Sequence, residues 1–113
     1  MKYMMFVVVD PAAAAEAQSA DELTIEQWLA EVDGPGKRVT GSQLRPATEA
    51  VTVRLSHGQL LVTDGPFVET KEWIAGFDIL DCENLEEAIA IAARHPMANR
   101  GKLEVRPFWT EEE

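Results

Sequence analysis

The spacing of hydrophobic residues divides the chain into short strands and two helices. Residues 2–9, KYMMFVVV, form a nearly continuous apolar run, which predicts a strand buried on both faces. Residues 73–80, WIAGFDIL, form a second run of this kind. Residues 51–55 alternate between apolar and polar side chains and residues 60–63 return, so a β-hairpin with a two-residue turn at 57–58 is expected.

The segment that begins near Thr24 has the period of an amphipathic helix. Thr24 and Gln27 form a capping-box pattern, and a competing pattern starts at Ser19. Gly34, which a proline follows, predicts a left-handed C-cap at the end of the helix. The expected buried stripe consists of Ile25, Trp28, Leu29 and Val32.

A second helix is expected from Asn84, whose side chain is spaced to cap the backbone of Glu87. The helix is expected to end at His95, which precedes a proline. Weaker strand patterns occupy residues 37–44 and 103–108. The expected buried stripe of this helix consists of Leu85, Ala88, Ile89 and Ala92.

The resulting order, β-α-β-β-β-β-α-β, predicts an α+β fold in one domain over residues 1–113. It is a ferredoxin-like split βαβ pair with an inserted hairpin and an antiparallel sheet. Two helices cover only one face of such a sheet, whereas the strands at 2–9 and 73–80 are apolar on both faces. We therefore expect a second copy to cover the other face, as a homodimer joined sheet to sheet.

Composition narrows the classes of partner. The formal net charge of −10 disfavours direct binding to nucleic acid and to anionic membrane surfaces. A single cysteine, Cys82, excludes an internal disulfide, and its acidic neighbours disfavour a reactive thiolate. No apolar run reaches the length of a transmembrane helix, and the start does not read as a signal peptide, so a cytoplasmic protein is expected. Small molecules and protein surfaces remain as partners.

Two residues are candidates for acid–base chemistry. The hairpin register places Asp64 opposite Val51 in the apolar row, where burial would raise its pKa; alternatively Asp64 accepts hydrogen bonds from its own turn. His95 follows the second helix, whose dipole would favour the charged ring; alternatively His95 is a surface cap. His57 is expected to be a turn residue. The two histidines lack ligand spacing, so no metal site is expected.

A dense central segment, DGPFVETKEWIAGF at residues 64–77, is a candidate for ligand binding. Within it, Phe67, Glu69 and Lys71 are candidate contacts, and Arg45 is a candidate partner for a carboxylate ligand. The alternative interpretation is a salt-bridged structural loop.

The same segment, followed by LEEAIAIAARHP and then LEVRPF, resembles the YCII-related, or DGPF-domain, family. The resemblance extends to MKYMMFVVV and VTVRL and covers nearly the whole chain. It implies a ferredoxin-like fold that dimerises into an α/β barrel, with a cleft between sheet and helices.

The resemblance leaves the function open between three classes. The first is a dimeric small-molecule-binding or accessory module with a cleft near the DGPF turn and no cofactor. The second is a cofactor-free lyase or isomerase that uses Asp64 and His95. The third is a protein-interaction module that works with a sigma factor. The family's acid–base pair has a histidine in the first helix and an aspartate before the proline after the second helix. Here the first helix has no histidine and His95 precedes Pro96, so enzymatic activity is left open.

Overall fold

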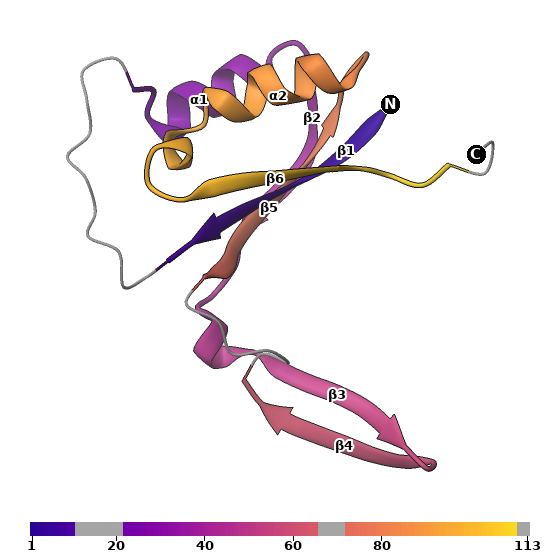
Figure 1. The fold of residues 1–113 in the computed structure, drawn as a ribbon. Helices are drawn as coiled ribbons and strands as arrows, with labels where there is room; N and C mark the ends of the chain where they lie inside the picture. The colour runs from indigo at the N-terminus through magenta and orange to yellow at the C-terminus, as the bar shows by residue number, and fades with distance from the viewer. Residues whose placement is uncertain (11–21, 66–71, 111–113) are drawn as a thin grey trace.

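The computed structural model describes residues 1–10, 22–65 and 72–110. They form a four-stranded antiparallel sheet in the order β2-β5-β1-β6, two helices on one of its faces, and a separate two-stranded hairpin (Figure 1). This architecture confirms the expected α+β class and element order. The elements are β1 (Lys2–Val9), α1 (Ile25–Asp33), β2 (Arg38–Gln43), η1 (Ala47–Glu49), β3 (Val51–Ser56), β4 (Gln59–Asp64), β5 (Trp73–Asp81), α2 (Leu85–Ala93), η2 (Pro96–Ala98) and β6 (Lys102–Pro107).

The core lies between the helices and the sheet. Alternate residues of β1 and β5 point toward the helices, because successive side chains of a strand point to opposite faces. Trp28 of α1 is fully buried among them. The buried cluster consists of Tyr3, Met5, Val7, Trp28, Val32, Leu80, Cys82, Ala88 and Ala92.

The opposite face of the sheet carries no described helix. Met4 and Phe6 alternate with buried residues of β1 and pair across the sheet with Ile79 and Phe77 of β5. All four are half-buried apolar side chains on the uncovered side. These strands are apolar on both faces, but the described helices cover only one of the two faces.

The helix starts follow the expected caps. The Thr24 hydroxyl accepts a hydrogen bond from the Gln27 N–H, and the Gln27 side-chain Oε1 accepts one from the Thr24 N–H. The competing start at Ser19 lies outside the described residues. The expected left-handed cap at Gly34 is wrong. Gly34 keeps a helical φ of −54°, and the positive φ of 76° falls at Gly36, because the chain completes a further turn before it enters β2.

Helix α2 is rotated from the expected orientation. Its Asn84 cap accepts from the Glu87 N–H as expected, and Ala88 is buried. Leu85 and Ile89, however, are 44% and 53% exposed, so their expected burial is wrong. The sheet-facing stripe instead runs through the small residues Ala88 and Ala92 and the partly buried Ile91. Small side chains let the helix lie close to the sheet, which leaves the larger ones outside.

Strands β3 and β4 form an arm, residues 51–64, that projects away from the sheet (Figure 1). The expected register is confirmed, with Leu55 opposite Leu60 and Val51 opposite Asp64. The turn is also confirmed: His57 and Gly58 both have positive φ, 50° and 79°. These are the signs of a type I′ turn, which matches the twist of a two-residue hairpin.

The expected burial of Asp64 is wrong in a single copy of the chain. Asp64 is exposed, as are all six residues of β4. The reason is that no described helix or strand packs on the arm's apolar row. Among the described residues, no helix is long and apolar enough to cross a membrane.

Candidate functional site

A cavity of about 450 Å³ lies between the helices and the β1-β5-β2 part of the sheet. Its walls are mainly apolar, and include Val7, Leu29 and Met97. Three ionisable side chains, those of Arg38, Asp78 and His95, also line it. A pocket of this size with apolar walls and a few convergent polar groups is the form that small-molecule sites take.

Arg38 and Asp78 form a largely buried ion pair across β2 and β5. The Arg38 Nε lies 2.6 Å from Asp78 Oδ1, and their side chains are 19% and 10% exposed. Arg38 also donates from Nη1 to Asp33 Oδ1 at 3.3 Å. Burial raises the pKa of Asp78, and the guanidinium opposes that rise without cancelling it. The Asp78 hydrogen bond raises the pKa of Arg38, which stays charged.

Gly41 makes room for this ion pair. It lies opposite Asp78 in the β2-β5 register, just after a bulge between Arg38 and Thr40. A Cβ at position 41 would collide with Asp78 Oδ1 and lie 2.6 Å from the Phe77 carbonyl oxygen. The glycine is therefore needed because the carboxylate occupies the space above its backbone.

His95 is a buried, neutral group at the opposite wall. It is 5% exposed, and its Nδ1 accepts a hydrogen bond of 3.0 Å from the Met97 N–H. The neutral ring therefore carries its proton on Nε2, as a donor. Burial lowers its pKa from 6.5 to about 4, so the expected charging by the helix dipole is wrong. The cost of desolvating the cation exceeds the benefit of the helix end. The alternative, in which His95 caps the helix at the surface, is also wrong, because His95 is buried.

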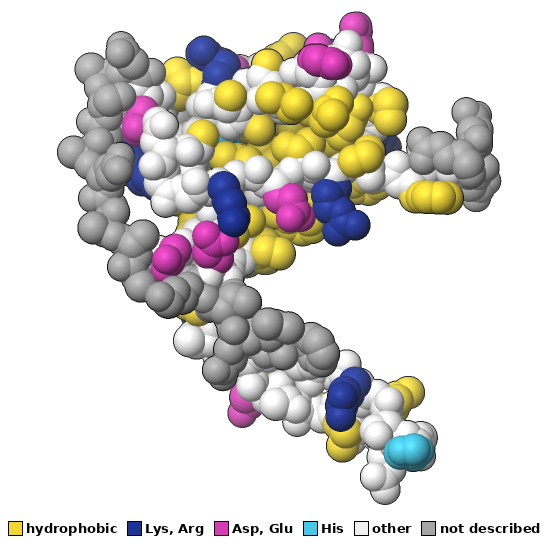
Figure 2. All heavy atoms as spheres, in the orientation of Figure 1, with side chains coloured by type: hydrophobic (Ala, Val, Ile, Leu, Met, Phe, Trp, Pro, Cys, Tyr) yellow, Lys and Arg dark blue, Asp and Glu magenta, His cyan; other side chains and the backbone are white. Residues whose placement is uncertain are grey.

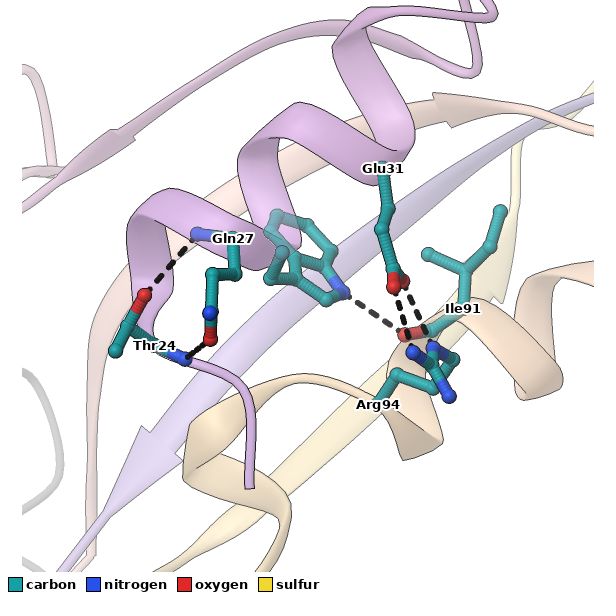
Figure 3. A network of polar contacts seen from close by, with 6 residues as sticks. Thr24, Gln27, Glu31, Ile91 and Arg94 are labelled. Carbon is teal, nitrogen blue, oxygen red and sulfur yellow. Dashed lines mark hydrogen bonds and ion pairs between the residues drawn. The ribbon is translucent and has the colours of Figure 1, made fainter. Parts of the chain in front are cut away.

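Polar contacts hold the two helices together (Figure 3). The Trp28 ring packs edge-to-face against His95, with centroids 4.7 Å apart. Its Nε1 donates to the Ile91 carbonyl at 3.0 Å. On the outside, Arg94 donates to both carboxylate oxygens of Glu31, at 2.6 and 2.8 Å. These contacts fix the distance between α1 and α2 and so hold the ring of His95 in place.

The residues expected to act at the site are scattered. His95 lines the cavity, whereas Asp64 lies on the exposed arm, and Asp64 is not among the residues that line it. Arg45 lies in the loop before the arm, is 83% exposed, and pairs with Glu49 at 2.8 Å. The expected contacts Phe67, Glu69 and Lys71 lie outside the described residues. A single copy therefore does not bring Asp64 and His95 together.

Sequence reasoning missed Arg38 and Asp78. One signal was available: Asp78 is the only charged residue within the apolar run 73–80. Gly41 in the strand before it was a second signal, because glycine in a strand often marks a close approach. Their pairing, however, depends on β2 and β5 being neighbours, which the local pattern does not specify.

Other reactive groups offer less chemistry. Burial, and then the neighbouring Glu87, raise the pKa of the Cys82 thiol, which disfavours the nucleophilic thiolate. Within residues 1–10, 22–65 and 72–110, no three histidine, cysteine or acidic side chains are grouped so as to hold a metal ion. The site's chemistry therefore rests on its ion pair, its neutral imidazole and its apolar walls.

Comparison with known proteins gives the family. The model of the YCII-related domain matches residues 1–111. An uncharacterized protein of Rhizobium meliloti (strain 1021) is 46% identical over 75 residues, which cover 65% of this chain and 60% of that protein. The match therefore spans less than two thirds of the relative. Because the family model spans almost the whole sequence, the chain belongs to the YCII-related family.

Proposed function

We propose that this protein is a homodimeric small-molecule-binding module whose ligand occupies the cavity between the helices and the sheet. The observation that carries the proposal is the convergence of a buried ion pair and a neutral imidazole on an apolar cavity of about 450 Å³. Buried charge is costly for a fold. A charge placed at a cavity wall is therefore a candidate for recognition of a ligand.

The charge of the site indicates the class of ligand. Arg38 already pairs with two carboxylates, those of Asp78 and Asp33. With His95 neutral, the cavity lining carries one guanidinium and one carboxylate, and Asp33, which lies outside the lining, adds a negative charge beside Arg38. The chain as a whole carries −10. A carboxylate or phosphate ligand would meet this charge unfavourably. We therefore expect an apolar ligand that is neutral or cationic and donates a hydrogen bond to Asp78.

Matched ligands test this assignment. Benzyl alcohol, benzylamine and benzoate share one ring and differ in charge, and can be titrated at pH 7 while amide and methyl NMR shifts are followed. We expect the alcohol and the amine to shift the signals of Leu29 and Met97, and benzoate to bind at least tenfold more weakly. Asp78→Asn should weaken the amine more than the alcohol, whereas Glu49→Gln, remote from the cavity, should change neither. Preference for benzoate would contradict the proposal.

The dimer is supported by the uncovered face of the sheet. Met4, Phe6, Phe77 and Ile79 form an apolar surface on the side away from the helices. Covering it with the same surface of a second copy gives a closed two-fold interface. Sedimentation at micromolar concentration should give twice the chain mass, and Phe6→Glu should give monomers. A wild-type monomer would contradict this part of the proposal.

A further inference from the structure

The arm carries an apolar surface that stays largely exposed in the part of the chain that the structure describes. One face holds polar side chains such as Thr52 and Thr63, and Thr52 also bonds the Gly65 carbonyl at the arm's base. The other face holds a row of branched apolar residues that are 56–71% exposed. An isolated two-stranded hairpin is marginally stable in water and needs such a face to be packed. The row consists of Val51, Val53, Leu55, Leu60 and Val62.

The dimensions of the chain also indicate a missing partner. The radius of gyration is 16.4 Å, whereas a compact domain of this length has about 13 Å. The chain exposes 8156 Å², and a compact monomer of 12.5 kDa exposes about 6,200 Å². The excess of about 2,000 Å² is larger than the roughly 800 Å² that a standard interface takes from each partner. The chain therefore has enough surplus surface for a stable dimer.

The body of the chain has a matching apolar groove between α2 and β6. Its volume is about 350 Å³, and Ile89, 53% exposed, lies at its edge. Figure 2 shows the hydrophobic side chains gathered there, between the helix and the strand. This groove lies beside the helices, so a partner's sheet packed on the opposite face would not cover it. Its lining includes Ile89, Ala92, Ala93, Ala98, Leu103 and Val105.

Charge favours contact between these two surfaces. Two copies of a chain with a net charge of −10 repel each other over most of their surface. The arm carries only Arg54 and Asp64, one charge of each sign, and Lys102 is the one charged residue that lines the groove. Contacts between weakly charged apolar surfaces avoid most of the repulsion. The arm projects away from its own helices, so it does not reach its own groove (Figure 1).

We propose that the arm of each copy packs its apolar row into the α2–β6 groove of the other copy. The exchange is reciprocal, so it closes under two-fold symmetry and does not propagate into a filament. This inference rests on the proposed dimer. It adds that the arm is a clasp, and it assigns a role to the exposed Ile89.

Cysteine crosslinking tests the clasp directly. The native Cys82 is 2% exposed, so introduced cysteines react selectively. Leu55→Cys chains are mixed with Ile89→Cys chains and oxidised at low protein concentration. We expect a disulfide-linked dimer from the mixture and little from either variant alone. The matched control replaces Ile89→Cys with Ile25→Cys, an exposed isoleucine of α1, and should give no crosslink.

The outcomes separate a failure of the clasp from a failure of the proposed dimer. A dimer by sedimentation without the Leu55–Ile89 crosslink overturns the clasp and leaves the proposed dimer standing. A monomer overturns both. Crosslinks between two Leu55→Cys chains also overturn the clasp, as do equal crosslink yields with Ile25→Cys and with Ile89→Cys. The clasp is likewise overturned if only another protein, or only another segment of the same chain, covers the arm.

Two substitutions provide a second readout that does not depend on oxidation. Leu60→Glu, on the apolar face of the arm, should raise the dimer dissociation constant at least tenfold. Arg54→Glu, on the other face of the neighbouring strand, adds negative charge without touching the row and should raise it less than threefold. Circular dichroism establishes that both variants fold. Equal effects of the two substitutions would contradict the clasp.

Discussion

Arg38 Nε lies 2.6 Å from Asp78 Oδ1, and this ion pair joins the edge strand β2 to the central strand β5 at the wall of the cavity. Forty residues separate the partners in sequence. Breaking a buried pair is costly, because the remaining charge loses its compensation. Asp78→Ala should therefore destabilise the fold by about 3 kcal/mol in denaturant unfolding. Asp33→Asn, which removes the more exposed partner of Arg38, should cost under about 1 kcal/mol. Equal costs would contradict the assigned roles.

The Arg38–Asp78 pair also predicts the effect of a methyl group at position 41. Gly41→Ala places a Cβ against Asp78 Oδ1 and the Phe77 carbonyl. We expect a loss of about 1–3 kcal/mol, as in other overpacked sites. In the Asp78→Ala background the same substitution should cost less, because the carboxylate is gone. Additive costs in this double-mutant cycle, measured by chemical denaturation, would show that the glycine does not serve the carboxylate.

His95 predicts a pH dependence of stability. Its pKa falls from 6.5 to about 4 on folding, so the unfolded chain binds more protons between these values. Stability is therefore lost as the pH falls from 6.5 toward 4, by at most about 3 kcal/mol from this group. Asp78, whose pKa is raised, acts in the opposite direction over its own range.

The variant His95→Gln isolates this contribution. Unfolding free energies of wild type and variant, measured from pH 7 to 4, should converge as the pH falls. Parallel curves would show that the ring titrates normally in the folded protein.

Two links join the helices, the Trp28–Ile91 hydrogen bond and the Glu31–Arg94 ion pair, and we expect the first to contribute more to stability. Trp28→Phe removes one of two hydrogen bonds to the Ile91 carbonyl, which keeps that from the Arg94 N–H, and opens space in the core, so it should cost about 2 kcal/mol. Glu31→Gln weakens the exposed pair with Arg94 and should cost under about 1 kcal/mol. Thermal unfolding in the same buffer compares the two, and a larger loss in Glu31→Gln would contradict this ranking.

Local chemistry in the sequence was sufficient for the helix N-caps and the hairpin. Thr24, Asn84 and the turn at His57 act on backbone groups within a few residues, so their roles follow from spacing. The rotation of α2 could not be obtained in this way. Leu85 and Ala88 fit the same helical period, and the choice between stripes depends on how closely the helix approaches the sheet.

The candidate site was predictable only in part. His95 was identified, but the local argument from the helix dipole gave the wrong charge state, because burial by Trp28 and the sheet determines it. Asp64 was favoured by the apolar row of the hairpin, which is exposed in a single chain. Asp78 was overlooked because its partner lies in another strand and its significance appears only when β2 and β5 are adjacent.

The most direct test of the cavity as the ligand site is the position of a bound probe. Intermolecular NOEs from benzyl alcohol, recorded at pH 7 with methyl-labelled protein, report which side chains touch its ring. If the ligand occupies the cavity, NOEs should appear to the methyl groups of Val7, Leu29 and Met97, which line it. NOEs to Ile89 or to the arm, with none to these three residues, would contradict it.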